Sequence, residues 1–125
     1  MLGEVNMRTV DGKNVILNDG PLKAKEASNR DYMMELDSEA LLQNYYLEAG
    51  IGQVFGGKIM RHTGWEDPSC QLRGHFLGHY LSAAAMKIHE TEDKEMRAKA
   101  ETIVHELRIC QIENGGLWAA SIPEK

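Results

Sequence analysis

Apolar residues recur at helical spacing over most of the chain, with three- and four-residue steps. This pattern predicts helices near residues 21–35, 38–49, 72–90 and 93–113 and an all-α fold class. Residues 1–20 lack the pattern and are expected to form an N-terminal extended segment, in which Val15–Leu17 is a short β-prone run. Residues 21–125 then form one helical domain.

Residues with known preferences for helix ends mark the boundaries of these segments. Pro21 suits a first helical position, and Asp37 suits a helix N-cap. Leu36 and Leu41 are spaced to pack across that cap as a hydrophobic staple. The Asn114-Gly115-Gly116 run is a helix stop. Helical spacing places Leu22 and Tyr32 on the apolar stripe of the first helix. It likewise places Leu72 on the stripe of the third helix and Val104 on that of the fourth, so all four residues are expected on the core side.

Residues 50–71 lose the helical pattern and are rich in glycine, which favours a long functional loop. This loop contains Trp65 and Glu66. An indole can stack on the C–H face of a sugar ring, and a carboxylate can hold hydroxyls or move protons. The alternative is a tryptophan that packs on the core beside a solvated glutamate.

His75 and His79 are four residues apart and therefore share one face of a helix. A metalloprotease motif requires glutamate directly after the first histidine, and Phe76 stands there. Since no third ligand is evident nearby, no metal is expected on this pair. The alternative is a pair of hydrogen-bonded histidines at a helix start, facing a polar pocket.

The formal net charge of -5 argues against a nucleic-acid partner, which would require a surplus of lysine and arginine. Cys70 and Cys110 form no CxxC motif and are expected to be reduced structural thiols. No stretch approaches the ~20 apolar residues of a membrane span, and no secretory signal is evident, so a cytoplasmic protein without a membrane partner is expected.

The stretch from Gly64 resembles one family, through GWE, then LxGHxxGHYLSAxA, a T-x-D turn and a Q-x-x-N-G ending. Upstream, a DGP start and an L-D-x-x-x-L-L-x-N-aromatic core match as well, so the resemblance covers nearly all of the chain after about Asn14. The family that this stretch resembles is that of the β-L-arabinofuranosidases of glycoside hydrolase families 127 and 146, in their amino-terminal region.

This resemblance implies an (α/α)6 barrel that removes β-L-arabinofuranose from plant glycans with retention of configuration. It also implies a cysteine thiolate nucleophile held near zinc in the complete family enzyme. Neither Cys70 nor Cys110 matches that motif, so neither role is carried onto them. No cofactor is expected in this chain itself.

The sequence is therefore interpreted as a C-terminally truncated, helix-pair part of the barrel, inactive alone and able to self-associate through apolar helix faces. We expect a carbohydrate partner bound by Trp65, Glu66, His75 and His79, although His79 could instead be buried packing between helices. The alternative function is a non-catalytic helical module for carbohydrate binding or protein interaction.

Overall fold

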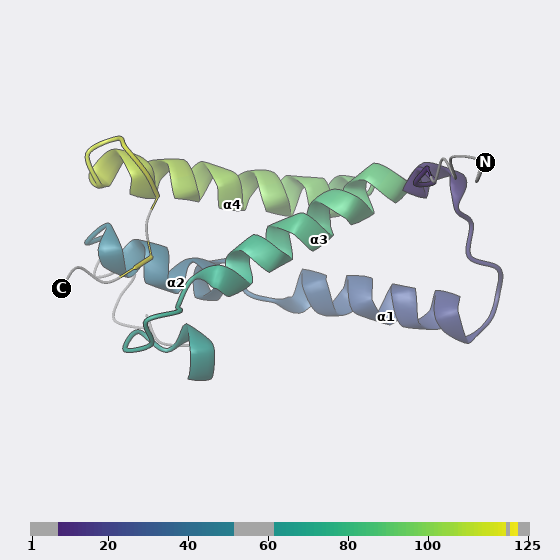
Figure 1. The fold of residues 1–125 in the computed structure, drawn as a ribbon, viewed down its shortest axis with the longest axis horizontal. Coiled ribbons are helices and arrows are strands. Elements are labelled where there is room, and N and C mark those ends of the chain that lie inside the picture. Colours follow the sequence, from purple (N-terminus) through teal and green to yellow (C-terminus); the bar gives the residue numbers. More distant parts are fainter. Residues whose placement is uncertain (1–7, 52–61, 120, 123–125) are drawn as a thin grey trace, which may run out of the picture.

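The computed structural model describes residues 8–51, 62–119, 121 and 122 (Figure 1). Its helices are α1 (Pro21–Glu35), α2 (Ser38–Glu48), α3 (His75–Thr91) and α4 (Lys94–Glu113), with 3-10 turns η1 (Gly12–Asn14) and η2 (Gly64–Glu66). No strand occurs among these residues, which confirms the predicted all-α fold class. None of the described helices is long and apolar enough to cross a membrane.

Local capping explains why the helices begin and end close to the predicted residues. The Asp37 carboxylate accepts from the N–H groups of Glu39 and Ala40, as expected for the N-cap of α2. Asp93 caps α4 in the same way through the N–H of Met96, at 2.9 Å. The end of α4 is closed by Gly115 and Gly116, whose N–H groups bond back to carbonyls of the last turn.

Helix α3 begins at His75, three residues later than predicted. Gly74 has a φ of +91°, a left-handed conformation that cannot continue a helix backward. Leu72 consequently precedes the helix and is exposed, so its assignment to the core was wrong.

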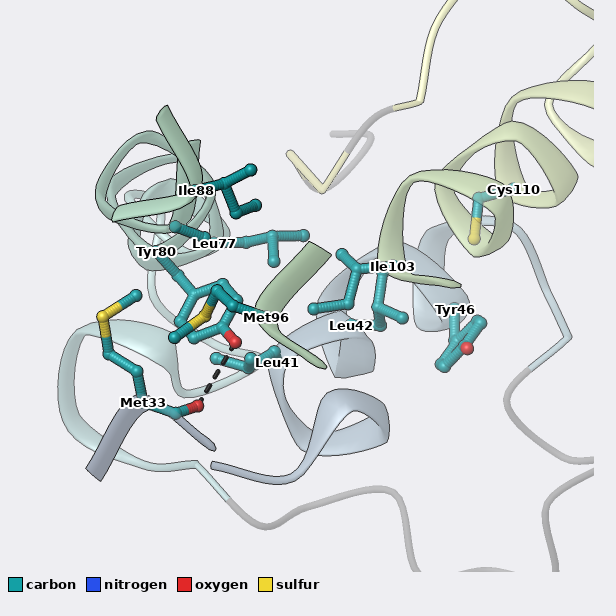
Figure 2. Close-up of a cluster of buried hydrophobic side chains, with 11 residues drawn as sticks. Met33, Leu41, Leu42, Tyr46, Leu77, Tyr80, Ile88, Met96, Ile103 and Cys110 are labelled. Carbon is teal, nitrogen blue, oxygen red and sulfur yellow. Dashed lines mark hydrogen bonds between the residues drawn. The ribbon is translucent and has the colours of Figure 1, made fainter. Parts of the chain in front are cut away.

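The core forms where α4 packs against α2 and α3 (Figure 2). In Figure 1, α3 crosses between α4 and the lower row formed by α1 and α2. The buried side chains come from all four helices: Met33, Leu41, Leu42, Tyr46, Leu77, Tyr80, Ala84, Ile88, Met96, Ile103 and Cys110. Val104, which the sequence pattern placed among them, is exposed on the outer face of α4.

Helix α1 is attached mainly by polar contacts at its C-terminal half. Met33 is its one buried residue among those described, and Leu22 and Tyr32 are exposed, against the stripe predicted for them. The Tyr80 hydroxyl donates to the Met33 carbonyl at 3.2 Å (Figure 2). The Lys99 ammonium donates to three carbonyls at the end of α1, those of Met33, Met34 and Leu36. A cation at a helix C-terminus is favourable because it meets unpaired carbonyls and the negative end of the helix dipole.

The described part of the N-terminal segment lies against the end of α3. Asp11 contacts the His89 ring at 2.8 Å, and η1 packs on the same helix. Val15–Leu17 has no strand partner in the described region and is exposed, so the β-prone run remains irregular. This agrees with the marginal stability of a single short strand.

Candidate functional site

The loop before α3 is held in place by two polar side chains of α2. Gln43 and Asn44 are almost completely buried. Both side-chain amides donate to the backbone carbonyl of Glu66, each at 2.9 Å. Gln43 also bonds the backbone of His62 in both directions, with N–H and carbonyl distances of 3.0 Å. Buried amides with these partners fix η2 on the surface of α2.

The Glu66 carboxylate caps the beginning of α3 from a distance in sequence. One oxygen accepts from the Gly74 N–H at 2.7 Å and from the Asn44 amide at 3.1 Å. The other accepts from the Phe76 N–H at 3.0 Å and lies 3.2 Å from His75 Nδ1. The first N–H groups of a helix lack partners within the helix and carry partial positive charge. Glu66 therefore joins α2, η2 and α3 through one half-buried carboxylate.

Gly74 is also the point where the segment after α4 returns to the site. A Cβ at this position would lie 1.9 Å from the Ser121 Oγ, so the close approach requires glycine. The Ser121 hydroxyl donates to the Arg73 carbonyl, and the Tyr45 hydroxyl donates to the Gly74 carbonyl. This region is tightly packed, which limits movement of the α3 N-terminus.

The buried Arg73 side chain links the loop before α3 to the segment after α4. Its guanidinium donates to the Ser121 carbonyl at 2.6 Å, donates to the Pro68 carbonyl, and pairs with the Glu48 carboxylate. Burial lowers the pKa of this guanidinium from its usual value. These contacts tie the loop before α3 to α2 and to the segment after α4, and removal of the Glu48 carboxylate would leave a buried charge uncompensated.

The rings of Trp65, His75 and His79 follow one another as a row on the surface. The row rests on a frame of polar residues, formed by Gln43, Asn44, Glu66 and Arg73. The Trp65 and His75 ring centroids are 6.0 Å apart, and those of His75 and His79 are also 6.0 Å apart with perpendicular planes. Trp65 is 73% exposed, which rules out the alternative of core packing in the described structure. His79 is exposed whereas its neighbour Tyr80 is buried. The structure thus brings Trp65, Glu66, His75 and His79 together, with three of them on the surface.

A family comparison identifies the chain. The model of the β-L-arabinofuranosidase, GH127 catalytic domain matches residues 14–123. The chain belongs to this family. No curated protein and no solved structure matches it. The four helices agree with an all-α part of the (α/α)6 barrel that the resemblance implied.

The GH127 chain does not assemble a zinc site within its described residues. These residues contain no group of three or more histidine, cysteine or acidic side chains that could hold a metal. Glu66 is the carboxylate that the structure places beside His75, and its oxygens already bind helix N–H groups. The described residues therefore offer no ligand set for the zinc that the family resemblance implies.

Neither described cysteine forms a disulfide. Cys110 is buried in the core, and burial, with a further contribution from Glu106, raises the pKa of its thiol to about 11. A thiol with this pKa is protonated at neutral pH and is a poor nucleophile. Cys110 is thus buried, as expected for a structural thiol, whereas Cys70 is only half-buried in the loop before α3.

The sequence interpretation missed the residues that hold the site. Gln43 was not singled out, and Asn44 entered only as the asparagine of the L-D-x-x-x-L-L-x-N-aromatic motif. Both interrupt an otherwise apolar run, and Asn44 follows Leu41 at core-facing helical spacing. A polar residue on an apolar face is a signal for a buried hydrogen bond. The sequence pattern assigned no role to Arg73, and nothing in the sequence pointed to Ser121 as its partner.

Proposed function

We propose that this GH127 chain supplies the amino-terminal, substrate-binding part of a glycoside hydrolase domain that acts on arabinose-containing plant glycans. The observation that carries the proposal is the exposed row of Trp65, His75 and His79, fixed on a buried polar frame. Family membership supports β-L-arabinofuranosides as the substrate class. The row occupies the loop and helix start that the family motifs cover.

Each ring of the row has a distinct task in this proposal. The Trp65 indole stacks on the C–H face of the sugar, and the two imidazoles hydrogen-bond its hydroxyls. The Glu66 carboxylate is only 14% exposed and is surrounded by N–H donors. We therefore assign Glu66 the task of positioning the site, in place of the direct hydroxyl contact that its sequence context favoured.

We further propose that the chain by itself releases no arabinose. The high pKa of Cys110 keeps that thiol protonated, and the carboxylate beside the row, Glu66, is engaged by helix N–H groups. Glycoside hydrolysis usually requires two carboxyl groups that flank the bond. Turnover of a β-L-arabinofuranoside by the purified chain, abolished by Cys70→Ser or Cys110→Ser, would contradict this proposal.

Titration with methyl β-L-arabinofuranoside, followed by NMR of the labelled chain, tests the binding proposal. Trp65→Ala and His75→Ala should each weaken binding by about tenfold or more, which corresponds to about 1.4 kcal/mol. The matched controls are Trp118→Ala and His105→Ala, which change an exposed tryptophan and an exposed histidine outside the row. Equal effects of site and control variants would refute the site.

In an active enzyme that carries this segment, His75→Ala should lower kcat/KM by ~10²-fold or more, the scale of a lost positioning contact. The melting temperature should change little, because the His75 ring is more than a third exposed. An unchanged rate together with lost stability would assign His75 to the scaffold.

We also propose that copies of this chain associate through apolar side chains on the outer faces of the helices. Helix α1 exposes Leu22 and Tyr32, and α4 exposes Val104 and Ile112. Helix α1 has a single buried residue among those described, so most of its apolar surface is in contact with water. Exposed apolar surface of this kind favours association.

A further inference from the structure

The surroundings of His75 Nδ1 determine which ring nitrogen carries the proton. Nδ1 lies 2.7 Å from the Leu72 carbonyl oxygen and 3.2 Å from Glu66 Oε1. A carbonyl oxygen and a carboxylate oxygen can only accept hydrogen bonds. If Nδ1 were unprotonated, its lone pair would face two negatively polarised oxygens. Both contacts are favourable only when Nδ1 carries hydrogen.

We propose that Glu66 and the Leu72 carbonyl fix His75 as the Nδ1–H tautomer, so that Nε2 accepts a hydrogen bond from a sugar hydroxyl. In a neutral imidazole, one nitrogen donates and the other accepts. Protonated Nδ1 therefore makes Nε2 the acceptor of the ring. Glu66 is a positioning residue in this arrangement, because it acts on the ligand through the His75 ring. This inference rests on the proposed function and deepens it.

The packing around the ring supports a single orientation. Trp65 lies on one side of His75 and His79 meets it edge-on. Glu66 is itself held by the Asn44 amide and by the helix N–H groups, so its oxygen cannot follow the ring if it rotates. In proteins, a carboxylate or carbonyl oxygen that accepts a hydrogen bond from one ring nitrogen commonly determines the histidine tautomer.

The tautomer selects among ligands by chemistry. A ligand group that meets His75 Nε2 must bring a donor hydrogen, as a sugar hydroxyl does. A ligand that presents only acceptor oxygens, such as a carboxylate, would meet a lone pair when the ring is neutral. With a neutral His75 ring, the site therefore suits polyols and sugars, whose hydroxyls can donate to Nε2.

A two-bond proton–nitrogen NMR spectrum of the ¹⁵N-labelled chain tests this inference without a variant. At a pH where the ring is neutral, His75 should show a pyrrole-like protonated Nδ1 and a pyridine-like Nε2. The His75→Ala spectrum assigns the signals, and exposed His105 is an internal reference for an unconstrained ring. A pyridine-like Nδ1 in His75 would overturn the inference, whether or not sugar binds.

Adding methyl β-L-arabinofuranoside extends the test to the ligand. The Nε2 resonance of His75 should move as its lone pair accepts a hydroxyl hydrogen, while Nδ1 stays protonated. An Nδ1–H ring that does not respond to sugar would confirm the tautomer and refute both its ligand and the proposed function. A response with a protonated Nε2 would refute the tautomer and leave the proposed function standing.

Glu66→Gln separates the carboxylate from the Leu72 carbonyl. The variant should raise the population of the Nε2–H tautomer, whereas the matched Glu101→Gln variant on the exposed face of α4 should not. Circular dichroism checks that both variants remain helical. An unchanged tautomer in folded Glu66→Gln would show that the Leu72 carbonyl acts alone and would overturn the role assigned to Glu66.

Discussion

Two glycines lie four residues apart at the start of α3, and only one of them occupies a position that a larger residue could not take. Gly74 has a φ of +91° and faces Ser121, whose Oγ would lie 1.9 Å from an added Cβ. Gly78 lies within the helix, and an added Cβ there would meet nothing within 4 Å. The sequence shows two similar Gly-His pairs, but only the first glycine is required by the backbone.

Gly74→Ala should therefore destabilise the chain, and Gly78→Ala should stabilise it. Left-handed backbone costs a residue with Cβ about 1–2 kcal/mol, and the clash with Ser121 adds to this. Alanine in a helix interior is favoured over glycine by about 0.5–1 kcal/mol. Urea unfolding of both variants measures the difference, and a stability loss in Gly78→Ala as large as that in Gly74→Ala would contradict this account.

The residues of the site were partly predictable. Trp65, His75 and His79 were found because their chemistry and spacing are local properties of the sequence. The position of Glu66 was predicted, but its contacts depend on Asn44 and Gly74, which lie 22 and 8 residues away. Contacts across such separations follow from tertiary packing, which periodicity does not contain.

At the scale of elements, most helix boundaries were predictable because they depend on a few neighbouring residues. The start of α3 was predicted three residues too early, because it depends on Gly74 and on the more distant Glu66. Asp37, Asp93 and the Gly115-Gly116 pair fix helix ends through local hydrogen bonds. The burial of α1 was not predictable. The sequence of α1 contains an apolar stripe, but polar contacts of Lys99 and Arg30 attach the helix. Leu22 and Tyr32 on that stripe remain exposed.

The contact between Arg30 of α1 and Asp93, the N-cap of α4, should make the stability of the fold depend on acid pH. Hydrogen bonds from Arg30 and then from the Met96 N–H lower the pKa of Asp93 from 3.8 to about 2. A carboxyl whose pKa is lower in the folded state stabilises the fold above its unfolded pKa and loses that contribution as pH falls. The free energy of unfolding should therefore decrease between about pH 4 and pH 2.

Urea unfolding of the wild type and of Asp93→Asn at several pH values checks this dependence. The variant should lose ~1–2 kcal/mol at neutral pH, where the wild-type carboxylate is charged, and should show a flatter profile in acid. Glu101→Gln is the control, because Glu101 is exposed on α4. Parallel acid profiles for wild type and Asp93→Asn would show that other carboxylates dominate.

At the scale of the whole molecule, the chain divides into a well-packed centre and a looser outer layer. Helix α4 packs on α2 and α3, and the frame around Glu66 joins their ends to η2. Helix α1 lies along the outside (Figure 1) and is held mainly at its C-terminal half, with a further ion pair between Glu26 and Lys87 of α3. The candidate site belongs to the rigid part, which suits a preformed binding surface.

The outer layer is where association between copies should occur. Exposed apolar residues on α1 and α4 lose contact with water when two copies meet, and this burial is worth roughly 25 cal/mol per Å². The average mass from sedimentation equilibrium should therefore rise with protein concentration. Leu22→Lys and Val104→Lys should return the chain toward a monomer, because each puts a charge into the buried surface. Val10→Lys, at an exposed position outside these helices, should have no effect. A constant monomer mass at all concentrations, or equal effects of the three lysine variants, would show that these helix faces stay in contact with water.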